Sequence, residues 1–150
     1  MIIEYTPEGG EPQRLDAGRM RASEIQIIER TADRRWDDIR EAMGQGDVNA
    51  MRTVAWAIKK RQEPTLRYGD FDPWDDELRV RLDARETRAY AAEIFAKYGS
   101  NPDDLAEAFN ELREVAADRE ACDAAIADVT APKDPEPAEP EPSPASPSDG

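Results

Sequence analysis

The 150-residue sequence contains no histidine and a single cysteine, Cys122. Without histidine, the sequence excludes Ser-His-Asp and Cys-His catalysis, histidine acid–base chemistry and histidine-containing zinc sites. One cysteine cannot build an internal disulfide framework or a cysteine-rich metal site. Cys122 stands among alanines in a predicted helix, where we expect a small packing residue and not a nucleophile. We therefore expect no enzyme activity.

Basic residues and long apolar runs are also scarce. The chain has 20 lysines and arginines against 34 aspartates and glutamates, which gives a net charge of -14. Phosphate contacts need a field of basic residues, so nucleic-acid binding is not expected. No apolar run approaches the roughly 18 residues that span a bilayer, and Met1-Ile2-Ile3-Glu4 lacks the character of a signal peptide. The sequence therefore predicts a soluble protein without a membrane partner.

The charges that are present are unevenly distributed. Residues 14–61 carry eleven bases and eight acids, whereas residues 62–130 carry eight bases and eighteen acids. A slightly basic first half attracts a strongly acidic second half. This attraction acts either within one molecule or head-to-tail between copies, so a homo-oligomer is one of two alternatives.

Apolar spacing predicts one mainly α-helical domain over residues 1–130, with a short β-hairpin at its N-terminus. Residues 2–6 and 11–16 are the predicted strands. Gly9 and Gly10 supply the turn between them because both accept positive φ. An isolated hairpin is only marginally stable, so we expect it to pack on the helices that follow.

Three predicted helices in the first half should share one core. The first follows a capping box of Ser23 and Gln26, the second carries an apolar stripe from Trp36 to Met43, and the third is capped by Asp47. The side chains expected in the shared core are Ile28, Trp36, Ile39, Val54 and Ile58.

The second half of the domain is predicted to hold an irregular loop and two further helices. Residues 65–83 are expected to be irregular. Asp83 and Glu86 form another capping box, and Gly99 is the expected C′ glycine of that helix. One long amphipathic helix is expected over about residues 102–129 because its apolar positions keep helical spacing.

The C-terminal tail, residues 131–150, cannot join a core. It holds seven of the twelve prolines and no apolar residue larger than alanine. Closely spaced prolines and like charges favour an extended, solvated chain. We therefore predict a disordered acidic tail.

The acidic loop over residues 70–77 is the main candidate for a metal site. A calcium-binding EF-hand loop that starts at Asp70 needs glycine at its sixth position and glutamate at its twelfth. Those positions hold Asp75 and Arg81. Neighbouring carboxylates such as Asp37 and Asp38 do not face each other on a helix, so they form no acid–base pair. We expect no metal and no cofactor.

Aromatic side chains near this loop are the candidate partner-binding residues. A loop rich in aromatic rings yet flanked by acids is costly to fold unless some rings dock on a partner. The candidate residues are Trp56, Arg61, Tyr68, Phe71 and Trp74. In the alternative interpretation, these rings pack against the helical core.

Several motifs occur in a fixed order between residues 10 and 75. They are Arg14-Leu15-Asp16, Ser23 to Arg30, Trp36 in a short helix, Gly46-Asp47 opening the Val54-Ala55-Trp56-Ala57 helix, Lys60-Arg61-Gln62-Glu63-Pro64-Thr65-Leu66, and the acidic aromatic loop Tyr68 to Trp74. This order and spacing resembles the tail assembly chaperones of long-tailed bacteriophages, especially those that infect actinobacteria. The resemblance covers about half of the chain and does not extend to residues 76–130.

The resemblance implies a non-enzymatic role. Members of this family bind the tape measure protein before and while tail tube subunits polymerise around it, and they are absent from the finished virion. The resemblance therefore implies the host cytoplasm as location, the tape measure protein as partner and the tail tube subunit as a further partner. Two alternatives are a structural head–tail connector or scaffolding protein of a phage, and a small acidic protein-binding regulator.

The same family commonly makes two products from one start site by a programmed frameshift. Ala131-Pro132-Lys133 can be encoded by a run containing C-CCA-AAG, on which both decoding tRNAs can slip back by one base and pair again. The site falls where the predicted folded body ends. A longer, frameshifted form of the protein, with the same body and another extension, is therefore a further expected partner.

Overall fold

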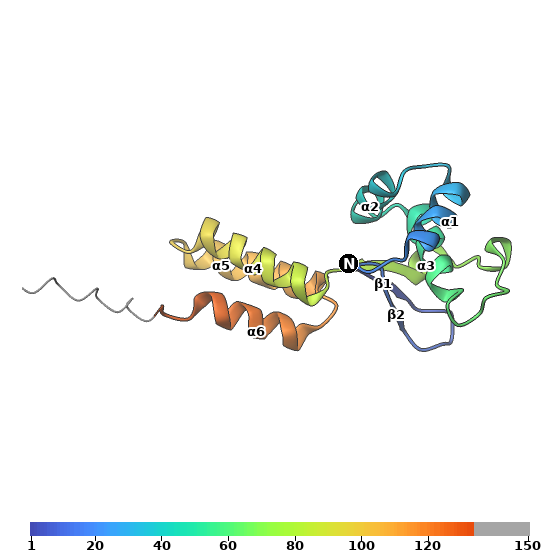
Figure 1. Ribbon diagram of the computed structural model, residues 1–150. Helices are drawn as coiled ribbons and strands as arrows, with labels where there is room; N and C mark the ends of the chain where they lie inside the picture. The colour runs from blue at the N-terminus through green and yellow to red at the C-terminus, as the bar shows by residue number, and fades with distance from the viewer. Residues whose placement is uncertain (134–150) are drawn as a thin grey trace, which may run out of the picture.

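The computed structural model describes residues 1–133 and shows a mainly α-helical fold with an N-terminal β-hairpin (Figure 1). The predicted tail lies outside the described residues from residue 134 onward. The helices are α1 Ala22–Ala32, α2 Trp36–Gly44, α3 Val48–Lys59, α4 Ala84–Tyr98, α5 Pro102–Val115 and α6 Arg119–Thr130. The strands are β1 Ile2–Tyr5, β2 Gln13–Asp16 and β3 Leu78–Arg81, and two short 3₁₀ turns cover Tyr68–Asp70 and Asp75–Glu77.

The predicted hairpin is present, but it is part of a three-stranded antiparallel sheet. The strand order is β2-β1-β3, and Ile3 of β1 lies opposite Leu15 on one side and Val80 on the other. The prediction that residues 65–83 are irregular is therefore wrong for β3. The alternation of apolar and charged residues in β3 is only four residues long. These residues form a strand because they pair with the edge of β1, which lies far away in the sequence.

The N-terminal unit, formed by the sheet and α1 to α3, has the predicted core. Ile28, Ile39, Val54 and Ile58 are buried in one hydrophobic cluster, and the partly buried Trp36 packs against it. Helix α3 lies in the middle of this unit and buries most of its length. The predicted N-cap also holds, because the side chain of Asp47 accepts a hydrogen bond from the backbone N–H of Ala50 at 3.0 Å.

Helix α1 begins earlier than the sequence predicts. Its N-cap is Arg21, and the Glu24 carboxylate accepts a hydrogen bond from the Arg21 backbone N–H at 2.8 Å. Ser23 therefore lies inside the first turn, and the predicted capping box of Ser23 and Gln26 is wrong. Glu24 takes over the role because Arg61, at the far end of α3, holds its carboxylate in place.

The second unit is a three-helix bundle of α4, α5 and α6. Its buried residues are Ala91, Phe109, Leu112, Cys122, Ala125 and Ile126. Gly99 follows α4 with φ -58, so the predicted left-handed C′ glycine is wrong. A left-handed residue is not required here, because the chain passes through a turn directly into α5, whose N-cap is Asn101. The helix predicted from about residue 102 does begin at Pro102.

The single long helix predicted over residues 102–129 is interrupted. The backbone N–H of Leu82 donates to the Val115 carbonyl, and the N–H of Ala117 donates to the Leu82 carbonyl, both at 2.9 Å. These bonds hold Ala116 in an extended conformation. Asp118 then caps α6 through the Ala121 N–H at 3.1 Å. A pairing with a residue more than thirty positions away breaks a helix that the local pattern favours.

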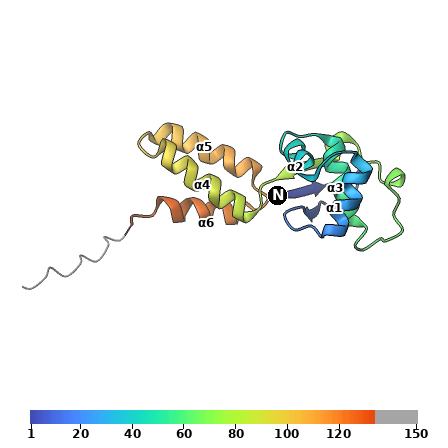
Figure 2. The same cartoon turned by 45° about the horizontal axis from the view of Figure 1, so that its top comes forward.

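The two units lie end to end, and Met1 is at the junction between them (Figure 1, Figure 2). The Met1 ammonium forms ion pairs with Asp83 and Glu86, the two residues of the capping box predicted for α4. Arg81 donates to the Glu114 carbonyl at 2.6 Å. These contacts, with the direct passage from β3 into α4, fix the bundle beside the sheet.

Candidate functional site

Two of the predicted partner-binding aromatic residues support the fold of the loop that follows α3. The Trp56 side chain is only 7% exposed, and its indole N–H donates to the Leu66 carbonyl at 3.0 Å. Trp56 and Tyr68 meet edge to face at 5.3 Å between ring centroids. The Arg52 guanidinium lies 4.2 Å from the centre of the Tyr68 ring, at cation–π distance. Tyr68 is partly buried.

Phe71 is also a core residue. Its side chain is 4% exposed and packs edge to face on Tyr5, with ring centroids 5.3 Å apart. The Phe71 carbonyl accepts a hydrogen bond from Arg52 Nε at 2.7 Å. The rings of Trp56, Tyr68 and Phe71 therefore pack within the N-terminal unit, as the alternative interpretation expects.

Arg61, the fourth candidate, lies at the end of α3 and contacts the start of α1. Its guanidinium forms two bonds to the Glu24 carboxylate, and its hydrogen bonding holds the pKa of Glu24 below the ordinary value of 4.5. Arg61 also donates to the Arg19 carbonyl at 3.2 Å. Its described contacts are therefore within the protein.

Trp74 is the one predicted aromatic residue whose ring is on the surface. Its side chain is 69% exposed, and the backbone N–H donates to Glu77 Oε2 at 3.0 Å. Acidic side chains surround it in sequence, with Asp72, Asp75 and Asp76 all exposed. Trp74 therefore differs in exposure from the three other aromatic candidates. It is the only one of the five that offers a large apolar surface to a partner.

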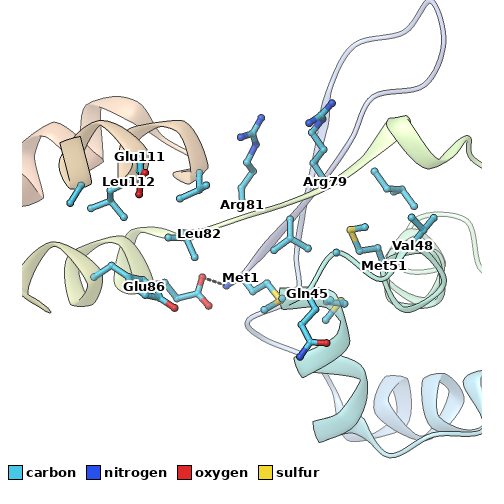
Figure 3. Close-up of a pocket in the computed structure, with 18 of the residues that line it drawn as sticks. Met1, Gln45, Val48, Met51, Arg79, Arg81, Leu82, Glu86, Glu111 and Leu112 are labelled. Carbon is cyan, nitrogen blue, oxygen red and sulfur yellow. Dashed lines mark ion pairs between the residues drawn. The ribbon is translucent and has the colours of Figure 1, made fainter. Parts of the chain in front are cut away.

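A second apolar surface, which the sequence did not predict, lies between the two units. This junction groove has a volume of about 930 Å³ (Figure 3). Strand β3 forms one side of it, the turn between α2 and α3 contributes another, and α4 and α5 extend it along the bundle. Lining residues from the N-terminal unit include Met1, Val48, Met51, Leu78 and Val80.

The bundle side of the junction groove includes two apolar side chains, Tyr90 and Val115, that are about half exposed. Tyr90, Ile94 and Tyr98 line it from α4, and Leu112 and Val115 line it from α5. Tyr90 is 49% exposed and Val115 is 45% exposed. The spacing of Tyr90, Ile94 and Tyr98 is typical of a core-facing helix stripe. The bundle buries the neighbouring face of α4 at Ala91. Ile94 packs against the bundle core, whereas Tyr90 is exposed and Tyr98 is half-buried.

Charged residues mark the ends and walls of the groove. Arg79 and Arg81 project together from β3 (Figure 3). Arg81 is 3.6 Å from Glu4 in an ion pair, whereas Arg79 is exposed. Glu86 and Glu111 line the bundle side. Glu86 lies 2.7 Å from the Met1 ammonium, and Glu111 is exposed. Asp75, just before β3, also lines the groove and is exposed. Arg81 and Glu86 are paired within the protein, so the exposed charges of the groove are Asp75 and Arg79 at β3 and Glu111 on α5.

Over residues 1–133 the side chains form no group of three or more residues suited to hold a metal ion. None of the helices described is both long and apolar enough to cross a bilayer. Cys122 is buried, and burial raises the pKa of its thiol. The junction groove is therefore the surface feature considered for binding.

Comparison with protein families, with curated proteins and with solved structures gives no match to this chain. An elongated apolar groove bordered by helices accommodates a segment of another polypeptide, since apolar contact supplies affinity and the charges at its borders supply direction.

Proposed function

We propose that the protein is a non-enzymatic chaperone that binds the tape measure protein of a long-tailed phage during tail assembly and leaves before the virion is complete. The observation that carries this proposal is the junction groove, in which Tyr90 and Val115 are about half exposed. Exposed apolar side chains gathered in one groove are typical of protein-binding surfaces. The family resemblance over residues 10–75 supplies the identity of the partner.

The chemistry of the chain suits this work. A tape measure protein is long, helical and partly apolar, so it needs cover before the tube surrounds it. Helix-in-groove contacts supply such cover. A net charge of -14 keeps the resulting complex soluble. The exposed ring of Trp74 offers a second, separate contact on the N-terminal unit.

Co-expression with the tape measure protein tests the proposal. We expect the tape measure protein to be recovered in soluble form with the chaperone and to precipitate without it. Purified virions should lack the chaperone. Its presence in virions at a fixed copy number would favour the alternative of a head–tail connector or scaffolding protein. A complex with a basic partner that dissociates in high salt would favour the small acidic regulator.

The longer form of the protein is part of the same proposal. A product that shares this body and carries another extension has one contact to the common partner and adds a second, for which the tail tube subunit is the proposed target. Two linked contacts raise the effective concentration of each. The nucleotide sequence that encodes Ala131 to Lys133 decides this point: a slip-permitting run followed by an overlapping open frame is expected.

A further inference from the structure

We propose that the junction groove binds one amphipathic α-helix of another protein, laid against α4 and α5 as a fourth helix of the bundle. The bound helix has a basic flank that faces the exposed Glu111 of α5, and its C-terminal end lies at the exposed Arg79 of β3. This inference rests on the proposed protein-binding function and specifies the kind of segment that is bound.

The arrangement of the lining residues along two helices favours a helix as the bound segment. Tyr90, Ile94 and Tyr98 recur every fourth residue along one side of α4. Leu112 and Val115 stand on the neighbouring side of α5. Two helices that meet in this way leave a lengthwise groove between their apolar rows, into which the side chains of a third helix fit.

The length of the groove sets the length of the bound segment. The lining residues of α4 extend from Glu86 to Tyr98, which is about 18 Å at the rise of an α-helix. A partner helix therefore contacts the groove over about three turns. Helix α6 contributes none of the lining residues. It packs on another side of α4 through Cys122 and Ile126, so the position opposite α4 and α5 is available.

Charge identifies the occupant as a different protein and not a second copy. Residues 82–133 carry twelve acidic and six basic residues. A symmetric pair of copies would bring together two bundles with the same net negative charge. Like charges placed opposite each other across an interface are unfavourable. A helix with lysines or arginines beside its apolar stripe is instead attracted to the bundle.

Charge also sets the direction of the bound helix. Arg79 is exposed at the β3 end of the groove, whereas Arg81, which projects beside it, is paired with Glu4 (Figure 3). The C-terminus of a helix carries a partial negative charge, and cations near it are stabilising. Helix α4 starts at this end of the groove and runs away from it. A helix that ends at Arg79 is therefore antiparallel to α4.

Synthetic peptides test the inference on the full-length protein. The first probe is a dye-labelled helix of about 14 residues with an apolar stripe, lysines along one flank and glutamates at its C-terminal end. The second probe has glutamates in place of the flanking lysines. The third probe carries its acidic residues at the N-terminal end. Binding is measured by fluorescence anisotropy at low salt. We expect the first probe to bind at least about tenfold more tightly than either of the others.

Matched variants locate the binding site. Tyr90→Ser and Val115→Ser should each weaken binding of the first probe about tenfold, since they remove half-exposed apolar contacts from the groove. The control Phe95→Ser changes another partly exposed aromatic residue of α4 that does not line the groove, and it should leave binding unchanged. Glu111→Lys should weaken binding, whereas Glu93→Lys makes the same change of net charge on an exposed residue outside the groove.

Several results would overturn the inference. These are equal binding of the first and second probes, wild-type affinity in a Tyr90→Ser protein whose helical circular dichroism is unchanged, and equal effects of Glu111→Lys and Glu93→Lys. A dimer in sedimentation that Tyr90→Ser dissociates would assign the groove to a second copy instead. Wild-type binding of the third probe would overturn the proposed direction.

A pull-down of the tape measure protein separates this inference from the proposed function. If the wild type and Tyr90→Ser retain it equally, the groove is not its binding site, although the chaperone function stands. If the first probe binds as expected and the wild type does not retain the tape measure protein, the groove binds a helix and the proposed partner is wrong.

Discussion

The Arg61 guanidinium donates a hydrogen bond to each oxygen of the Glu24 carboxylate, from Nε to Oε1 at 2.6 Å and from Nη2 to Oε2 at 2.8 Å. The pair joins the end of α3 to the first turn of α1. Glu24 also accepts the Arg21 backbone N–H, so one carboxylate serves the cap of a helix and a contact between helices. Planar two-point pairing of this kind is specific to arginine among the cationic side chains.

We expect Arg61→Ala to reduce the free energy of unfolding by about 1 to 3 kcal/mol, because a hydrogen-bonded carboxylate that is mostly buried loses its charged partner. Urea unfolding followed by circular dichroism measures the change. Arg67→Ala is the control, since Arg67 is exposed and has no ion pair among residues 1–133. A loss in Arg61→Ala no larger than in the control would contradict a structural role for this side chain.

The same pair predicts a dependence of stability on pH. Hydrogen bonding from Arg61 lowers the pKa of Glu24 below its ordinary value of 4.5. Its stabilising effect is therefore fully present above about pH 4.5, the value of the unfolded chain, and is lost as the pH falls through the lower pKa of the folded state. Glu24→Gln should melt below the wild type at pH 7. The two melting temperatures should converge in acid.

Glu11→Gln controls for the general effect of removing one acid, because Glu11 is exposed and makes no ion pair in the described part of the chain. Its melting temperature should follow that of the wild type from neutral to acidic pH. A gap between Glu24→Gln and the wild type that stays constant down to pH 3 would show that the carboxylate charge of Glu24 does not contribute.

Phe71 and Trp74 provide a paired test of core and surface roles in one loop. Phe71→Ala should reduce the free energy of unfolding by about 3 to 5 kcal/mol, since it removes a buried ring that packs on Tyr5. Trp74→Ala should change it by less than about 0.5 kcal/mol, because its ring is exposed. Thermal unfolding of both variants measures the contrast. Equal losses would mean that the Trp74 ring is part of the folded core.

Phe71 and Trp74 also show which part of the site could not be predicted from the sequence. Both residues are large, aromatic and flanked by aspartates, so composition treats them alike. Their burial differs because Tyr5 of β1 and Arg52 of α3 contact Phe71, and neither contact can be inferred from the sequence of the loop. The junction groove was missed for the same reason. The stripe of Tyr90, Ile94 and Tyr98 has helical spacing, but spacing does not tell which helix faces remain uncovered.

The parts of the fold that depend on near neighbours were predictable. Asp47 and Asp83 cap helices as expected, because a cap needs only a carboxylate and an N–H three residues later. The periodic apolar residues Ile28, Ile39 and Val54 entered one core. Strand β3 could not be predicted from its own residues, because it forms by pairing with β1, which is more than seventy residues earlier in the sequence.

The break between α5 and α6 gives the last prediction, because two causes can be separated there. Asp118 is the N-cap of α6, and Leu82 pairs with the backbone on both sides of Ala116. If the pairing with Leu82 causes the break, Asp118→Ala should cost only the cap, about 1 kcal/mol, with no change in helical circular dichroism. Asp118→Asn keeps an oxygen at the cap and should stay within a few tenths of a kcal/mol of the wild type. A stronger helical signal in Asp118→Ala would mean that α5 and α6 join once the cap is gone, so that Asp118 and not Leu82 separates them.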